Sequence, residues 1–598
     1  MPNEMEDANS RRPLIPAEGS VPIHVYGSTS PKDQANVSIS ETDDNNSTMA
    51  GLRDDIENED DFAQAGVQQA DAINLVWTRS TLIVAYFFIF LCSFASALQW
   101  QIISNLTPYV TSEFSSHSLI PTIGIVASIL SGVLKLPISK IIDAWGRPQG
   151  LAAVVVLATI GLILMAACTN IKTYAAAQVF YQIGLSGFSY ILSIIIADTS
   201  SLKNRALAFA FSTSPSLITT FIGPPIARWF YEQSSWRWAF GFSSISFLLL
   251  SLPILVVLMR NARKAAKLGV LPTSPDVKIA PKSFGYYLEE FDVTGVVLLA
   301  MGLSMIFVPF SLGIKSSNRS SLVLVAMGFA TLFAFAVHEK YQAKKPIIPF
   351  GLLFSRNTGG SCLLMIVLFV SYFSWDSYYS SYLQVVHGLN IAEAGYIDHI
   401  YGLGSCLWAA VVGYLIRVTD RYKWLAWAGL PFHILGGVAM IAFRRPDSSV
   451  SLLVLCQVMI TIGGSTLVVV GQMAVMAVCT HAELASVMAI LSLASYIGSA
   501  GGNALSGAIW NSTLPNALAR LLPDFSAEEL ALLCSDMKRQ LSYPMGSPVR
   551  DAIITAYDQA QVKMCLTGTA FALLQIVAVM MWRDVRVSQT TQVKGKVI

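Results

Sequence analysis

One aspartate stands inside a long apolar run, and its neighbours are aromatic. The sequence around it reads Tyr372-Phe-Ser-Trp-Asp376-Ser-Tyr-Tyr379-Ser380-Ser-Tyr382. Helical spacing places Tyr372, Asp376 and Tyr379 on one face, with Ser380 beside them. A carboxylate within a membrane span costs about 2.5–3.5 kcal/mol, so it is functional by default. Asp376 could exchange a proton when water leaves its surroundings. The phenol groups, that of Tyr382 included, suit a bulky, oxygen-rich ligand. The alternative is a carboxylate that bonds neighbouring hydroxyl groups for helix packing.

Other polar side chains in apolar runs are weaker candidates. Gln99 and Trp100 could face the same space as that aspartate, although half of any apolar helix faces lipid or a neighbouring helix. Asp398 and His399 lie near the expected outer end of the tenth span, where a histidine titrates near the external pH. The alternative for this pair is an interfacial polar cap. Lys135 is expected to extend its amine to the cytoplasmic boundary of the membrane.

The elements that must position these residues are membrane-spanning helices. Hydrophobic residues make up 54% of the 598 residues, charged residues make up 13%, and the mean hydropathy is +0.56. A soluble domain of this size would need far more charge on its surface. A run of about 20 apolar residues crosses a bilayer, and it must be a helix because lipid cannot satisfy free backbone groups. We therefore expect an all-α membrane protein of about fourteen spans. They are 80–103, 118–139, 150–169, 173–197, 206–228, 237–259, 293–313, 320–338, 359–383, 394–416, 423–443, 450–478, 484–509 and 562–582.

Composition also restricts the partners. The net charge of +2 gives no indication of nucleic-acid binding. The eight cysteines are scattered and include no C-x-x-C pair, so no metal site is expected. The lipid bilayer is the one partner that the composition itself requires.

Charged residues predict how the chain is oriented. With the N-terminus inside, Lys and Arg are about twice as frequent in the cytoplasmic loops as in the outer loops, as the positive-inside rule requires. Both chain ends are then cytoplasmic. The expected order is a disordered acidic cytoplasmic tail (1–79), an N-terminal six-helix half (80–260), a basic cytoplasmic loop (261–292), an inserted helix pair (293–340), a cytoplasmic loop (341–358), a C-terminal six-helix half (359–582) and a cytoplasmic tail (583–598).

Three sequons fall at outer loops in this arrangement. They are Asn105-Leu-Thr107, Asn318-Arg-Ser320 and Asn511-Ser-Thr513, and we treat the three asparagines as glycosylation candidates. The last outer loop, 510–561, is unusually long, and Ser526-Ala-Glu-Glu predicts a short helix within it. Cys534 lies in this loop and Cys565 at the outer edge of the last span, and the sequence leaves open whether they form a disulfide.

Two short cytoplasmic loops carry an acidic residue followed closely by arginine. They read Asp143-Ala-Trp-Gly146-Arg147 and Asp420-Arg421. Such a pair could latch one packing state of a bundle and release in another; the alternative is an ordinary charged turn. The first loop resembles the loop 2–3 signature of the major facilitator superfamily, and the second resembles its degraded repeat. The resemblance implies the fourteen-helix branch, with two parallel six-helix halves and an inserted seventh and eighth span.

Further motifs sharpen the resemblance. They are Ile196-Ala-Asp198-Thr-Ser-Ser-Leu-Lys203-Asn-Arg205, Phe291-Asp292-Val-Thr-Gly295 and the stretch around Asp376, followed by Gly388-Leu and Ala394-Gly395-Tyr396. Together they make residues 75–585 similar to the fungal siderophore–iron transporter family. Acidic residues that relatives often carry in spans one and four are replaced here by the uncharged stretches 96–101 and 192–196.

This resemblance implies a transporter and not an enzyme. The expected function is proton-coupled import of ferric siderophores by a monomer in a fungal plasma membrane or endosomal vesicle. No cofactor is expected, because the iron arrives inside the chelate and the proton gradient supplies the energy. Two alternatives remain: a proton-antiport exporter of a secondary metabolite or glutathione, and a receptor that binds siderophore without transport.

Overall fold

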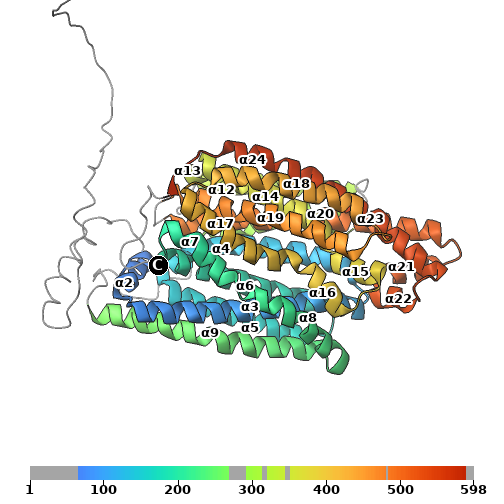
Figure 1. The fold of residues 1–598 in the computed structure, drawn as a ribbon, viewed down its shortest axis with the longest axis horizontal. Helices are drawn as coiled ribbons and strands as arrows, with labels where there is room; N and C mark the ends of the chain where they lie inside the picture. Colours follow the sequence, from blue (N-terminus) through green and yellow to red (C-terminus); the bar gives the residue numbers. More distant parts are fainter. Residues whose placement is uncertain (1–64, 269–290, 313–318, 344–349, 480–482, 588–598) are drawn as a thin grey trace, which may run out of the picture. The chain divides into compact units, whose positions relative to one another are not determined.

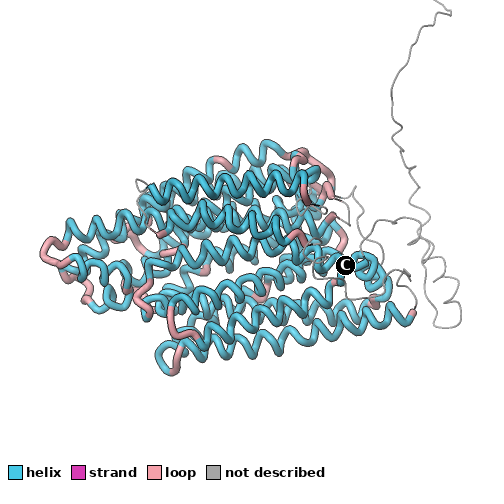
Figure 2. Tube along the Cα trace, turned by 180° about the vertical axis from the view of Figure 1, so that it is seen from behind, coloured by secondary structure: helices cyan, strands magenta, loops and turns pink. Residues whose placement is uncertain are grey.

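Helices make up the part of the chain that the computed structural model describes, which is residues 65–268, 291–312, 319–343, 350–479 and 483–587; no strand occurs there. Fourteen helical segments in these residues are long and apolar enough to cross a membrane, as predicted. In Figure 2 helices (cyan) account for most of the described chain, with loops and turns (pink) between them. A helix satisfies its own backbone hydrogen bonds, which is why apolar runs of this length fold in this way in lipid.

The first six spans form the N-terminal half. They are α3 (Arg79–Glu113), α4 (Ile120–Trp145), α5 (Arg147–Ala167), α6 (Ile171–Thr199), α7 (Leu202–Thr213) with α8 (Ser216–Gln233), and α9 (Trp236–Lys267). A short 3₁₀ turn, η1 (His117–Leu119), precedes α4. The fifth span is divided before Ser216, where Pro215 has no backbone N–H to donate.

The inserted pair consists of α11 (Val293–Ser311) and α12 (Arg319–Tyr341). The two backbones approach closely, since a Cβ added to Gly302 would lie 3.2 Å from the carbonyl oxygen of Gly328. The end of α11 is bonded to both halves: Ser311 Oγ lies 2.8 Å from Thr122 Oγ1, and Asn511 Nδ2 donates to the Ser311 carbonyl at 2.7 Å. The pair is therefore anchored where the halves meet.

The last six spans form the C-terminal half, which begins after the short helix α13 (Phe350–Leu353). They are α14 (Arg356–Asp376) with α15 (Tyr379–His387), α16 (Ile391–Asp398) with α17 (Ile400–Thr419), α18 (Lys423–Phe443), α19 (Val450–Met476), α20 (Leu484–Leu521), and α23 (Pro548–Leu573) with α24 (Gln575–Met581). In Figure 1 the blue-to-green helices of the first half lie beside the yellow-to-red helices of the second. α4 and α20 pack along one another and join the halves.

The bundle has two ends, which we call the α22 end and the α2 end. The α22 end carries the short helices α21 (Ala527–Ser535) and α22 (Met537–Ser542), and the α2 end carries α2 (Ala65–Val76), which lies at the opposite end of Figure 1. An even number of spans returns the chain to the end at which it entered. Residues 65–76 and 582–587 accordingly lie at the α2 end.

The tail prediction is wrong for its last fifteen residues. α2 packs on α4 and α9, with Ala72, Ile73 and Val76 buried. Asn74 Nδ2 donates to the Asp198 carbonyl at 3.0 Å. The apolar residues recur at helical spacing on one face, and that pattern outweighs the polar composition of the segment. The basic loop also begins later than expected, since α9 continues to Lys267.

The last outer loop is shorter than predicted and partly helical. α20 has 38 residues and rises roughly 57 Å, so its end projects beyond a hydrocarbon core of about 30 Å. Only residues 522–547 separate it from α23. Ser526 caps α21 as predicted, because its hydroxyl accepts from the Glu529 N–H while Glu529 accepts from the Ser526 N–H. These bonds to Ser526 lower the pKa of the Glu529 carboxyl.

Candidate functional site

The ninth span breaks immediately after its aspartate. α14 ends at Asp376 and α15 begins at Tyr379. Between them, Ser377 Oγ donates to Asn503 Oδ1 on α20 at 2.8 Å, which fixes the break against that helix. Transporters of this architecture build their substrate and ion sites where spanning helices are discontinuous. The break therefore marks the neighbourhood of Asp376 as the candidate site.

Two carboxylates from different spans lie within electrostatic range of one cation here. Asp376 of α14 and Asp398 at the end of α16 interact electrostatically with each other, and each interacts with Arg444. Tyr372 lies beside them, with its ring centroid 4.7 Å from that of Tyr401 on α17. Like charges at close range disfavour double ionisation, so this cluster has the chemistry to exchange a proton.

Arg444 is the residue that sequence reasoning missed. Its side chain is 1% exposed, and its guanidinium carbon lies 4.2 Å from the ring centroid of Tyr379, 5.0 Å from that of Tyr382 and 5.2 Å from that of Trp375. Nη2 donates to the Trp375 carbonyl at 3.5 Å. No carboxylate of the described residues lies within 4.0 Å of it. The Arg-Arg-Pro-Asp sequence resembles a polar outer turn, and only the next residue, Arg445, behaves as such.

Arg444 changes the expected role of two tyrosines. Tyr379 and Tyr382 are buried, and their rings lie against its guanidinium. The break at residues 377 and 378 separates these tyrosines from α14. Tyr372, on α14, interacts with Asp376 directly.

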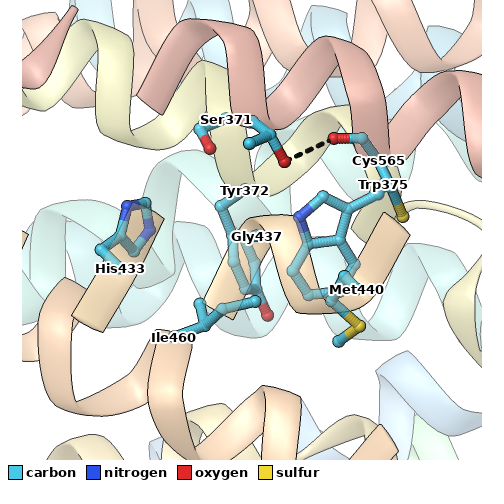
Figure 3. Close-up of a pocket in the computed structure, with 9 residues that line it drawn as sticks. Ser371, Tyr372, Trp375, His433, Gly437, Met440, Ile460 and Cys565 are labelled. Atoms are coloured by element: carbon cyan, nitrogen blue, oxygen red, sulfur yellow. Dashed lines mark hydrogen bonds between the residues drawn. The ribbon is translucent and has the colours of Figure 1, made fainter. Parts of the chain in front are cut away.

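A small cavity lies inside the C-terminal half next to this cluster. Its volume is about 10 Å³, and Figure 3 shows Tyr372 between His433 and Trp375 at its wall. The lining residues are Ser371, Tyr372, Trp375, His433, Gly437, Met440, Ile460, Cys565 and Thr569. A space of this size holds no more than one water molecule. A bulky ligand must therefore enter after the helices have moved apart.

His399 lies at a contact between the halves and not at an open surface. Its Nε2 is hydrogen-bonded to Asn105 Nδ2 at 3.1 Å and to Ser104 Oγ at 3.3 Å, both on α3. Its Nδ1 lies 3.9 Å from Asp398 Oδ2. Gly395 also lies against the Asn105 side chain, because a Cβ on Gly395 would lie 2.3 Å from Asn105 Oδ1. These contacts close the α22 end and link the closure to the carboxylate cluster through Asp398.

Gln99 and Trp100 are not brought to Asp376 by any contact in the described residues. Gln99 is buried, and among those residues neither side-chain polar atom has a hydrogen-bond partner. Trp100 is 44% exposed. Trp100 is one turn from Ser104, which contacts His399, so its helix face is directed toward the C-terminal half.

The first predicted latch is an ion pair, and it has a third member. Arg147 Nη1 lies 2.9 Å from Asp143 Oδ1, and Nε lies 3.2 Å from Asp198 Oδ2. All three side chains are buried. Gly146, with φ +102°, makes the turn between α4 and α5. Asp198 belongs to a motif visible in the sequence, but nothing local showed that it would reach Arg147.

The second loop is built differently. Arg421 pairs with Asp584 at 3.1 Å on the surface. Asp420 caps α17 with φ +57°, and its carbonyl accepts from the Val587 N–H at 3.2 Å. This loop therefore holds the segment that follows α24, and its ion pair is exposed where that of Arg147 is buried.

Two of the three glycosylation candidates are wrong. Asn105 is 3% exposed within α3, so a glycan on it would displace His399. Asn511 is half-buried in the last third of α20, and its amide nitrogen donates to the Ser311 carbonyl. Asn318 lies outside the described residues. Cys534 and Cys565 are both free thiols, and the Cys565 sulfur accepts from Arg444 Nη1 at 3.7 Å.

Comparison with known proteins identifies the architecture and the relatives. The model of the Major Facilitator Superfamily matches residues 89–355 and 364–513. An MFS siderochrome iron transporter 1 of Ajellomyces capsulatus is 44% identical over 90% of this chain and 92% of its own. MFS siderochrome iron transporter D of Aspergillus fumigatus is 42% identical over 89% and 90%. The siderophore iron transporter mirB of Emericella nidulans is 38% identical over 89% of each chain.

Solved structures agree on the fold. A bacterial homologue of the human lysosomal transporter Spinster, in an inward-facing and unoccupied conformation, aligns with a TM-score of 0.52 at 15% identity, covering 85% of this chain and 98% of that one. The human organic anion transporter MFSD10 aligns with a TM-score of 0.50 at 12% identity, covering 83% and 99%. At these identities the likeness concerns the fold alone.

Proposed function

We propose that this chain, which belongs to the siderochrome iron transporters of the major facilitator superfamily, imports ferric siderophores together with protons. The observation that carries the proposal is the 44% identity, over 90% of the chain, to a protein described as an MFS siderochrome iron transporter. The iron travels inside the chelate as substrate.

Proton coupling is assigned to the carboxylate cluster. Asp376 and Asp398 lie beside a break in the ninth span and a contact between the halves. Protonation of a carboxylate there can change the charge at the site and also bias the contact that closes the α22 end. Coupling requires a group that affects both. Asp376 is the proposed proton carrier, with Asp398 as its partner.

The proposed setting is a fungal plasma membrane or endosomal vesicle, with both chain ends cytoplasmic and the α22 end outside. The excess of Lys and Arg in the loops at the α2 end supports this orientation. One chain supplies two halves and an inserted pair, so a monomer is a sufficient transporting unit.

Uptake of radio-iron tests the proposal. The chain is expressed in a yeast that lacks its own siderophore transporters, and cells receive ⁵⁵Fe-loaded trihydroxamates with or without a protonophore. We expect accumulation of iron that the protonophore abolishes. Chelate lost from preloaded cells would indicate the exporter instead. Binding without accumulation would indicate the receptor, and accumulation indifferent to protonophore would remove proton coupling.

A further inference from the structure

A buried lysine lies between the halves, at the α2 end. Lys135 on α4 is 7% exposed, so the prediction that it reaches the membrane boundary is wrong. Its amine lies 4.7 Å from the ring centroid of Tyr496 on α20 and 5.9 Å from that of Tyr190 on α6. One ring belongs to each half, so Lys135 sits at their junction.

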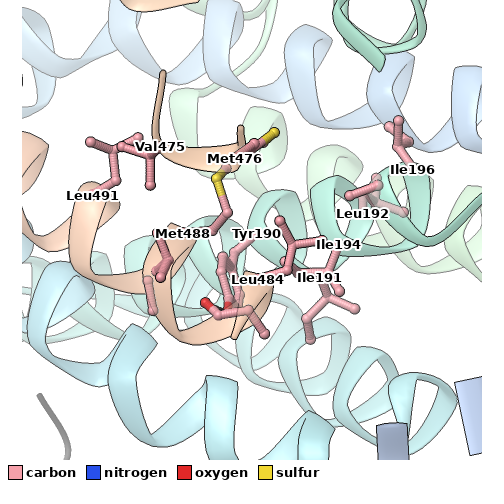
Figure 4. Close-up of a cluster of buried hydrophobic side chains, with 14 of the residues drawn as sticks. Tyr190, Ile191, Leu192, Ile194, Ile196, Val475, Met476, Leu484, Met488 and Leu491 are labelled. Carbon is pink, nitrogen blue, oxygen red and sulfur yellow. Dashed lines mark hydrogen bonds between the residues drawn. The ribbon is translucent and has the colours of Figure 1, made fainter. Parts of the chain in front are cut away.

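The junction around Lys135 is closed in this structure. Tyr190 Oη donates to the Ala485 carbonyl on α20 at 2.6 Å, and Figure 4 shows Tyr190 beside Leu484 and Met488 of that helix. A Cβ on Gly132, one turn from Lys135, would lie 2.7 Å from Tyr496 Cβ. Transporters of this fold alternate between ends, so this junction must open during the cycle. Opening it withdraws Tyr496 from Lys135.

Lys135 has no counter-charge among the described residues. None of their carboxylates lies within 4.0 Å of its amine, whereas the buried Arg147 lies within 3.2 Å of two carboxylates. A ring face contributes about 0.5–2 kcal/mol to a cation, and burial of an ammonium costs several kcal/mol. An anionic group that bound at this junction would supply a counter-charge to the Lys135 amine.

We propose that Lys135 binds an anionic oxygen of the transported chelate and favours chelates with net negative charge. This inference rests on the proposed function. Three hydroxamates neutralise Fe³⁺, so the charge of a ferric trihydroxamate is set by its pendant groups, and a pendant carboxylate is the group that Lys135 recognises. The site forms as Tyr496 leaves, when the halves part at the α2 end.

A charge series on one core tests the inference. Ferrioxamine B carries a free ammonium, its N-acetyl derivative is neutral and its N-succinyl derivative carries a carboxylate. Uptake KM is measured for the three ⁵⁵Fe chelates with wild type, Lys135→Gln, Lys135→Met and Lys135→Arg. Lys140→Gln, which removes one positive charge from the same helix, is the matched control.

We expect Lys135→Gln and Lys135→Met to raise KM for the succinyl chelate by about tenfold, with less than about twofold change for the acetyl chelate. Lys135→Arg should retain the preference, and Lys140→Gln should match wild type. Equal changes for all three chelates, or none, would overturn the inference; Lys135→Met, which keeps the apolar stem, guards against misfolding. If wild type takes up none of the three, the proposed function fails and not this inference alone.

Discussion

Arg147 donates from Nε to Asp198 Oδ2 at 3.2 Å, and this bond ties the start of α5 to the end of α6. The same guanidinium holds Asp143 at 2.9 Å, so one buried arginine serves two buried carboxylates. The three groups form a single electrostatic unit at the α2 end.

This unit predicts unequal effects of its members. Arg147→Ala removes the cation that both buried carboxylates contact and should cost about 3–5 kcal/mol of stability. Asp143→Asn leaves the pair with Asp198 in place, so it should lower Tm less while still slowing uptake. The measurement is thermal unfolding of the purified variants beside their uptake rates. Equal Tm values for both variants, with wild-type uptake, would show an ordinary charged turn.

Asp376→Asn tests the proposed proton carrier. Asn keeps the volume and hydrogen-bonding capacity of the side chain but cannot ionise, so we expect uptake to collapse while folding survives. Asp376→Glu should restore part of the activity. Asp558→Asn, which removes a carboxylate bound to Arg445 at 3.0 Å in the same half, is the control. Wild-type uptake with unchanged pH dependence in Asp376→Asn would make it a packing residue, with Asp398 and His399 next to examine.

Arg444→Gln tests the counter-charge of the cluster. Without the guanidinium, Asp376 and Asp398 lose the cation with which both interact, so uptake and Tm should both fall. The double variant Asp376→Asn/Arg444→Gln should be less destabilised than the sum of the singles, by about 0.5–3 kcal/mol. Arg445→Gln, which removes the neighbouring half-exposed charge, should have little effect on uptake. Strict additivity in the double-mutant cycle would separate Arg444 from Asp376.

Gly395→Ala tests the closure at the α22 end. Its Cβ would lie 2.3 Å from Asn105 Oδ1, so α16 could no longer reach α3 and uptake should fall. Asn105→Ala should restore uptake in the double variant by making room. Gly402→Ala is the matched control, since nothing lies within 4 Å of its new Cβ. Loss of uptake in Gly402→Ala to the same degree would point to helix stiffness and not to the contact.

Thiol counting tests the cysteine arrangement. All eight cysteines are free, so eight maleimide groups should add to denatured protein without reductant. Burial raises the pKa of the Cys534 thiol to about 11, so little thiolate exists at neutral pH. Its alkylation in folded protein should be slow at pH 7 and accelerate as pH rises toward that value. Six additions in the denatured protein would reveal a disulfide.

The sequence by itself determined what depends on neighbouring residues and on the solvent. The spans follow from hydropathy, because an apolar run in lipid must form a helix to satisfy its backbone hydrogen bonds. The capping box at Ser526 is local and was predicted. The spacing of Asp143 and Arg147 identified them as a latch, but the structure showed that Arg147 pairs with Asp143 and Asp198. The motifs also sufficed to identify the family, which the 44% identity confirms.

Tertiary structure decided which side chains meet across the bundle. Nothing near Arg444 in the sequence showed that three rings from another span would enclose it, or that Asp376 and Asp398 would share it. The sequence predicted Lys135 at the membrane boundary, whereas the structure places it between rings of α6 and α20. In both cases the groups that stabilise the buried cation are distant from it in the chain. Such contacts depend on how whole helices pack against one another, and the periodicity of a single helix does not predict that packing.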